Sequence, residues 1–161
     1  MPRVTRRTFA KAAALSFAAP MVLQAKNRAD KLRIAIIGSG GRGGANLGGV
    51  AGEEIVALCD VNASGVEQAA KKYPEARKYS DFRKIFEKPD AFDAVMVSTC
   101  EHTHYHATML ALKNKKHVYC EKPLSHNVWE AREMRLAAAK SGVVTQMGIQ
   151  MHAGDNYRRV V

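Results

Sequence analysis

The sequence predicts an α/β protein built on a doubly wound parallel sheet. Short apolar runs alternate with longer amphipathic stretches, which is the order expected of β-α-β units around such a sheet. The runs at 93–98 and 143–147 contain no alternation of polar residues, as expected for strands that are covered on both faces. A chain of 161 residues is long enough for one ordinary domain with a hydrophobic core.

The expected elements follow from local patterns along the chain. Apolar runs predict strands at about 32–37, 54–59, 77–80, 93–98, 117–120 and 143–147. The stretches between them predict helices at about 42–51, 63–73, 81–88, 103–114 and 126–141. The last helix has the clearest ends, because Ser125 and Asn127 are candidate N-caps and Gly142 is a candidate C-cap.

A glycine-rich turn follows the first predicted strand. Gly38, Gly40 and Gly43 form a G-x-G-x-x-G pattern, with Gly41 and Arg42 inside it. Such glycines let the backbone turn tightly, approach a pyrophosphate closely and pack the next helix against the strand. The N-terminus of that helix presents free N–H groups and a partial positive charge to an anion. The pattern therefore predicts a dinucleotide-binding site on a Rossmann nucleotide-binding fold.

An acidic residue completes this pattern. Asp60 ends the second predicted strand, about 20 residues after the glycine turn. A carboxylate there can accept hydrogen bonds from the adenosine ribose and would repel a 2′-phosphate. The sequence therefore favours NAD over NADP as cofactor.

The first predicted helix and its end are rich in further glycines, at Gly44, Gly48, Gly49 and Gly52. Each interior glycine costs a helix about 1 kcal/mol relative to alanine. We therefore expect this helix to be held by packing on the sheet.

The net charge of +10 is concentrated at the N-terminus. Residues 1–33 carry +7 of it and the rest of the chain carries +3, so a nucleic-acid partner is not indicated. The apolar stretch at 12–23 is too short to span a membrane and is interrupted by Pro20.

Residues 1–30 read as a targeting segment. Arg6 and Arg7 precede Phe9, and the mildly apolar stretch 12–19 follows, as in a twin-arginine export signal. This layout predicts the twin-arginine export machinery as a partner and a periplasmic location. The alternatives are a disordered basic tail or a surface helix on a cytoplasmic protein. The predicted organisation is thus a leader at 1–30, a nucleotide-binding domain at 31–150 and the start of a connection at 151–161.

No metal site is predicted. Cys59, Cys100 and Cys120 match no metal or redox spacing, which favours buried or half-buried free thiols. His102, His104 and His106 alternate in a segment expected to open a helix, where alternate side chains point apart.

Taken together, these motifs resemble the glucose-fructose oxidoreductase/inositol dehydrogenase/MocA (Gfo/Idh/MocA) family. The strongest part is the run Lys116-His117-Val118-Tyr119-Cys120-Glu121-Lys122-Pro123, and the resemblance covers residues 32 to about 159. It implies an NAD(P)-binding Rossmann domain followed by a larger α/β domain that binds a sugar or cyclitol. We expect that second, substrate domain to be missing from this chain. The resemblance also implies a homo-oligomer for the full-length protein.

The resemblance assigns roles by position. It implies cofactor contacts from the glycine turn, the strand ends and the Glu-Lys-Pro motif: Gly38, Gly40, Gly41, Arg42, Gly43, Asp60, Thr99, Glu101, His104, Glu121 and Lys122. Lys122 also corresponds to the family's catalytic lysine, near the nicotinamide and the reacting hydroxyl. The chain departs from the family pattern at Cys100, Glu101 and His152, where proline, asparagine or aspartate, and arginine are usual.

The sequence thus favours one function and leaves two alternatives. The favoured function is the cofactor domain of an oxidoreductase that transfers hydride between a carbohydrate or cyclitol hydroxyl and NAD(P). The alternatives are a glycosidase that oxidises its sugar only transiently, and an inactive nucleotide-binding fragment. Because residues 155–161 resemble the start of another helix, we expect a truncated chain that is inactive alone.

Overall fold

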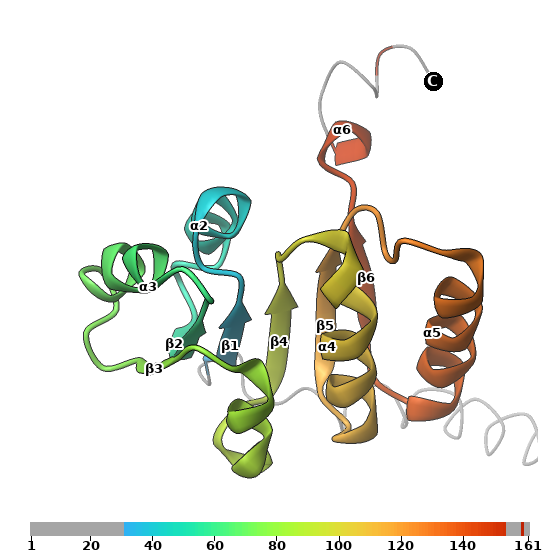
Figure 1. Cartoon of the computed structure of the whole chain (residues 1–161), viewed down its shortest axis with the longest axis horizontal. Helices are drawn as coiled ribbons and strands as arrows, with labels where there is room; N and C mark the ends of the chain where they lie inside the picture. The colour runs from blue at the N-terminus through green and yellow to red at the C-terminus, as the bar shows by residue number, and fades with distance from the viewer. Residues whose placement is uncertain (1–30, 154–158, 160–161) are drawn as a thin grey trace, which may run out of the picture. The chain divides into compact units, whose positions relative to one another are not determined.

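A computed structural model describes residues 31–153 and 159 (Figure 1). Its centre is a parallel sheet of six strands in the order β3-β2-β1-β4-β5-β6. The strands are β1 (Arg33–Ile37), β2 (Glu54–Cys59), β3 (Arg77–Tyr79), β4 (Ala94–Val97), β5 (His117–Glu121) and β6 (Thr145–Gly148). The predicted doubly wound parallel sheet is confirmed, and all six strands lie within a few residues of their expected positions.

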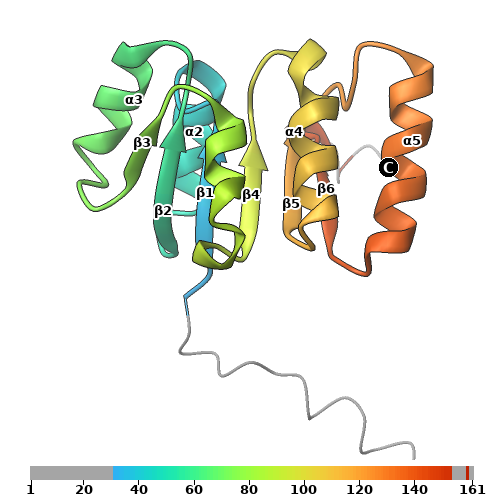
Figure 2. The same cartoon turned by 60° about the horizontal axis from the view of Figure 1, so that its bottom comes forward.

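Helices cover both faces of this sheet. They are α2 (Gly41–Gly49), α3 (Ala63–Ala70), α4 (Glu101–Lys113), α5 (Val128–Ser141) and the short α6 (Gln150–Ala153). In Figure 2, α2 and α4 lie on opposite sides of the strands. Successive side chains of a strand point to opposite faces, so β1 buries Ile34 and Ile36 with α2 and α3, and Ala35 and Ile37 with α4. The absence of polar alternation in the strands is explained by this double coverage.

Two helical predictions needed correction. The segment predicted as a helix at 81–88 is a 3-10 helix, η1 (Phe82–Glu87), followed by a second short one, η2 (Pro89–Ala91). Asp81 caps η1 through the Arg83 amide, and Pro89 restricts Lys88 to a non-helical conformation, so little room is left for α-helical bonding. Helix α4 begins at Glu101, two residues earlier than expected, and α6 was not predicted.

The ends of α5 are as predicted at Asn127 and Gly142. The Asn127 carboxamide oxygen accepts a hydrogen bond of 2.9 Å from the Glu130 amide, and Gly142 closes the helix with φ of +72°. Ser125 is not the cap, because its hydroxyl donates to the Asn127 carbonyl instead.

Replacing Asn127 with alanine should therefore lower the free energy of unfolding by about 1 kcal/mol, because one amide of the first turn loses its acceptor. Denaturant unfolding measures this difference. Ser125→Ala is the matched control and should change stability by less than about 0.5 kcal/mol. Equal losses for the two variants would contradict the assignment of the cap.

The prediction that packing on the sheet holds α2 is confirmed at its two buried residues, Gly43 and Leu47. A Cβ atom added at Gly48, Gly49 or Gly52 would have no neighbour within 4 Å. These three glycines are therefore not required by packing, and Gly52 lies beyond the end of the helix.

The predicted leader at 1–30 lies outside the described residues. In the part of the chain that the structure describes, no helix combines the length and apolarity that a membrane span requires. The three cysteines are free thiols, of which Cys59 and Cys120 are buried and Cys100 is exposed rather than half-buried. Burial raises the pKa of the Cys59 thiol to about 12 and that of Cys120 to about 11.

Candidate active site

The sheet has its switch point between β1 and β4. These neighbouring strands are parallel, but the chain leaves β1 toward β2 on one side and leaves β4 toward β5 on the other. The segments that follow Ile37 and Val97 therefore diverge and open a crevice at the carboxyl ends of the strands. Ligands of open parallel sheets bind in such crevices.

The glycine turn lies at this crevice and requires glycine at two places. Gly38 has φ of +86°, and a Cβ atom there would come within 2.6 Å of the Ser98 carbonyl group. A Cβ atom at Gly43 would overlap the carbonyl oxygen of Gly38. The first glycine thus permits the turn, and the last permits close packing of α2 on β1.

The N-terminus of α2 is open to an anion. Its N-cap is Gly40, no side chain caps it, and its first turn contains no acidic residue. Free N–H groups at a helix start favour a phosphate, and the helix dipole adds to this preference. The turn therefore fits the pyrophosphate of a dinucleotide.

Asp60 fixes the shape of this turn. Its Oδ2 atom accepts hydrogen bonds of 3.0 Å from the amides of both Ser39 and Gly40. Its Oδ1 atom accepts one of 2.9 Å from the Asn62 amide. The carboxylate thus joins the end of β2 to the glycine turn at the edge of the crevice, and its contact with a ribose stays a prediction.

Two cavities lie along the crevice. The first, of about 500 Å³, is lined in part by Gly38, Gly40, Asp60 and the exposed Val61. The second, of about 330 Å³, is lined by Arg42, Ser98, Thr99, Glu121, Lys122 and Gln150. Ser98 and Thr99 line both cavities, so the crevice runs from Asp60 to Lys122.

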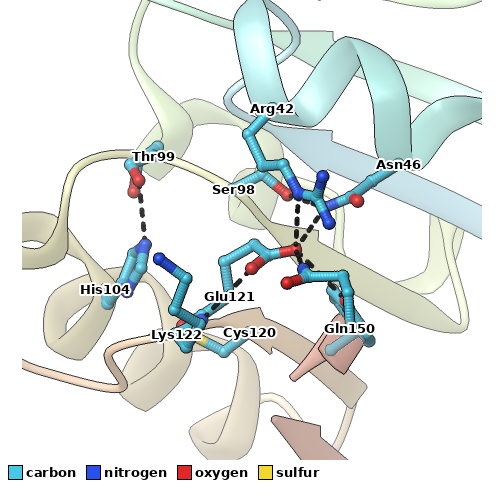
Figure 3. Close-up of polar contacts among 10 residues, drawn as sticks. Arg42, Asn46, Ser98, Thr99, His104, Cys120, Glu121, Lys122 and Gln150 are labelled. Atoms are coloured by element: carbon cyan, nitrogen blue, oxygen red, sulfur yellow. Dashed lines mark hydrogen bonds and ion pairs between the residues drawn. The ribbon is translucent and has the colours of Figure 1, made fainter. Parts of the chain in front are cut away.

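Glu121 is the centre of a buried polar network in the second cavity (Figure 3). It is 4% exposed, and its Oε1 atom accepts hydrogen bonds from four side chains. The donors are Asn46 at 2.8 Å, Tyr119 at 3.2 Å, Arg42 at 3.3 Å and Gln150. Its Oε2 atom faces the Lys122 amide at 3.3 Å. The network joins α2, β5 and α6 around one carboxylate.

These contacts control the charge of Glu121. Burial by itself raises the pKa of the carboxyl group, but the hydrogen bonds from its neighbours outweigh burial and lower the pKa from 4.5 to about 2. The pKa of the Tyr119 hydroxyl shifts in the opposite direction, because burial and the nearby Glu121 charge both raise it. Glu121 is therefore a carboxylate at neutral pH, and Tyr119 remains a donor to it.

The structure divides the remaining predicted site residues into those that line the second cavity and those that do not. Thr99 and Lys122 line the second cavity together with Arg42. Glu101 is exposed in the first turn of α4 and lines neither of the two cavities. His104 is 1% exposed, and its ring contacts backbone carbonyl groups. Cofactor contacts of Glu101 and His104 therefore stay predictions that the arrangement of these side chains does not favour.

Sequence reasoning missed three members of the Glu121 network. Asn46 follows Arg42 by one helical turn, and Tyr119 precedes Glu121 by two residues in a strand, so each shares a face with a predicted site residue. These spacings could have identified both. Gln150 has no such signal, because it enters the site from α6 after a change of direction in the chain.

The strand order, the glycine turn at the switch point and the polar cavity beside it define a dinucleotide-binding domain of the oxidoreductase type. Comparison with known proteins agrees with this class. Residues 32–149 match the family model described as oxidoreductase family, NAD-binding Rossmann fold. The chain belongs to this Gfo/Idh/MocA family.

Individual relatives give the same picture. The chain is 30% identical over 132 residues to myo-inositol 2-dehydrogenase of Thermotoga maritima, covering 80% of this chain and 39% of the relative. It is 32% identical over 117 residues to the uncharacterized oxidoreductase YrbE of Bacillus subtilis, covering 71% and 33%. The crystal structure of myo-inositol 2-dehydrogenase from Lactobacillus plantarum superposes with a TM-score of 0.75 at 25% identity, covering 81% and 40%. This chain thus spans about two-fifths or less of the length of these relatives.

Proposed function

We propose that this chain is the NAD-binding part of a dehydrogenase that oxidises a hydroxyl group of a cyclitol or sugar. The observation that carries this proposal is the continuity of the crevice, since Ser98 and Thr99 line both the Asp60 cavity and the Lys122 cavity. The glycine turn and Asp60 would hold the adenosine and pyrophosphate part of NAD. Arg42, Thr99 and Lys122 would lie at its nicotinamide end.

Lys122 is the proposed catalytic residue. A bound NAD supplies the acceptor for the hydride that leaves a carbinol carbon. The hydroxyl proton must leave as well, and a lysine amine can accept it or stabilise the developing negative charge. Lys122 is exposed at the cavity, beside the buried Glu121 carboxylate. Its side chain is therefore free to meet a substrate that enters from solvent.

Titration calorimetry with NADH tests the binding part of this proposal. The full chain should bind NADH in a single-site titration, and Gly40→Val should weaken binding because the new side chain would lie against Asp60. Gly49→Ala, on a part of α2 with no neighbour within 4 Å, is the matched control and should bind as the wild type does. No heat at any tested NADH concentration would contradict the proposal.

The charge of Asp60 should set the preference between the two cofactors. In Asp60→Asn we expect NADPH affinity to rise by about tenfold, about 1.4 kcal/mol, because the carboxylate no longer repels a 2′-phosphate. NADH affinity should fall in the same variant, since an amide is a weaker acceptor than a carboxylate for a ribose hydroxyl. Paired titrations with NADH and NADPH measure the ratio. An unchanged ratio would contradict a role of Asp60 in cofactor choice.

The substrate side of the proposal draws on the relatives, among them myo-inositol 2-dehydrogenase. The chain spans about two-fifths or less of their length, and closing an active site against water needs walls on every side. We therefore expect no NADH to accumulate when this chain alone is incubated with NAD⁺ and myo-inositol. Steady formation of NADH would show that these residues suffice for turnover.

We also propose that residues 1–30 direct export by the twin-arginine pathway. The supporting observation is the pair Arg6-Arg7 before Phe9 and the mildly apolar stretch 12–19. A reporter fused to residues 1–30 should reach the periplasm, and replacing both arginines with lysine should keep it in the cytoplasm. Retention of the unaltered fusion would contradict export.

A further inference from the structure

His104 has contacts that the proposed chemistry does not use. It lies in the first turns of α4 and is one of the largest fully buried side chains in the described part of the protein. Its Nδ1 atom lies 2.7 Å from the Pro123 carbonyl oxygen, and its Nε2 atom lies 2.9 Å from the Thr99 carbonyl oxygen. Figure 3 shows the contact with Thr99.

The two carbonyl groups belong to the two segments that border Lys122. Thr99 is in the loop from β4 to α4 and lines both cavities. Pro123 directly follows Lys122 in the turn after β5. In Figure 3 the Lys122 side chain lies between those of His104 and Glu121. Both polar atoms of the His104 ring face the backbone, so neither is directed to a ligand.

We propose that His104 is a positioning residue that holds the Lys122 turn against the Thr99 loop. Carbonyl oxygens only accept hydrogen bonds, so the ring nitrogen that carries the hydrogen donates to the carbonyl it faces, and the tautomer decides which of the two contacts is that hydrogen bond. An imidazole suits this task because it is rigid and carries two nitrogen atoms on different edges. Within this turn, the Lys122 amide also donates a hydrogen bond to Oε2 of the preceding residue, Glu121. The inference deepens the proposed function, since it concerns how the proposed catalytic lysine is held.

His104 thus bridges the Thr99 loop and the Lys122 turn through its contacts with the Thr99 and Pro123 carbonyl groups. Three substitutions test the two contacts of this bridge separately. In His104→Asn the amide nitrogen can replace Nδ1 and keep the contact with Pro123, while the contact with Thr99 is lost. In His104→Gln the amide nitrogen can replace Nε2 and keep the contact with Thr99, while the contact with Pro123 is lost. His104→Phe fills the space with no donor and loses both contacts.

Amide hydrogen exchange of the full chain, resolved by segment, is the readout. We expect His104→Phe to accelerate exchange by about tenfold or more in residues 99–103 and 121–125, with little change elsewhere. His104→Asn should accelerate exchange mainly in 99–103, and His104→Gln mainly in 121–125. If His104→Phe fails to fold, the opposite patterns of the other two variants still decide the question.

The matched control is His106→Phe, the same change at an exposed position of the same helix, which should leave both segments unchanged. Identical exchange patterns in the asparagine and glutamine variants, or a uniform rise over the whole chain, would overturn the bridge and reduce His104 to a packing residue. NADH titration of the wild type, run in parallel, tests the proposed function separately. Absence of NADH binding with the expected exchange patterns would reject the function and keep the bridge.

Discussion

Replacing Gly43 with alanine should lower the free energy of unfolding by about 4 kcal/mol, a large share of the stability of a small domain. The new Cβ atom would overlap the Gly38 carbonyl oxygen and would lie 3.3 Å from the Ser98 side chain. The overlap is with backbone, so a change of rotamer cannot relieve it. Helix α2 would have to move away from β1, and the turn that fits the pyrophosphate would change shape with it.

Gly48→Ala is the matched control for this prediction. It changes a glycine to alanine in the same helix, at a position where a Cβ atom has no neighbour within 4 Å. It should stabilise the protein by about 0.5–1 kcal/mol, because glycine is a poor helix former. Denaturant unfolding and NADH titration of both variants check the pair. Wild-type stability in Gly43→Ala would show that α2 does not pack on the strand as described.

Replacing Glu121 with glutamine should be the second most damaging change. The Oε1 atom accepts from four side chains, and an amide in its place offers fewer acceptor sites and adds two N–H donors. The exposed guanidinium of Arg42 would also lose its counter-charge. Breaking a buried charged network by changing one partner costs about 3 kcal/mol or more. The free energy of denaturant unfolding at neutral pH measures this loss.

The same residue should give the protein a specific loss of stability in acid. The pKa of Glu121 is lowered in the folded state, from 4.5 to about 2. The stabilisation is therefore fully present above pH 4.5 and is lost as the pH falls from 4.5 toward 2, by about 3 kcal/mol in total. In Glu121→Gln this part of the pH dependence should be missing. Unfolding free energies measured across that range in both proteins give the comparison.

Glu67→Gln is the matched control for both experiments on Glu121. Glu67 forms an ion pair of 2.9 Å with Lys78, but its side chain is 63% exposed. Exposed ion pairs contribute about 0–1 kcal/mol, so this variant should keep nearly the wild-type stability and its pH dependence. If Glu67→Gln lost as much stability as Glu121→Gln, burial of the Glu121 network would not explain its effect.

Much of the fold could be predicted because its signals are local. The apolar run that ends at Ile37, the glycines from Gly38 to Gly43 and the acid at Asp60 each follow from a periodicity or a short spacing. The segment at 81–88 was the clearest error. Its composition suits an α-helix, but the proline at position 89 and the short connection to β4 leave a 3-10 helix.

The candidate site could be predicted only in part. The Glu121-Lys122-Pro123 motif indicated where chemistry would occur, and Asp60 lies at the glycine turn as the motif requires. The hydrogen-bond partners of the predicted side chains were less predictable. Asp60 bonds the backbone of the turn in this structure, and His104 bonds two carbonyl groups. Both contacts connect a side chain to the backbone of a different segment, which no spacing in the sequence reveals.

The candidate lysine was indicated by the family resemblance, whereas the sequence by itself determined the parallel sheet and the place of the dinucleotide crevice. These depend on strand and helix periods and on the conformations that glycine permits, which are properties of neighbouring residues. Only the tertiary structure decided that Arg42 and Gln150, 79 and 29 residues from Glu121 in the sequence, both donate hydrogen bonds to its buried carboxylate. The physical reason is that a buried charge needs several donors at once, and the fold brings them together from α2, β5 and α6.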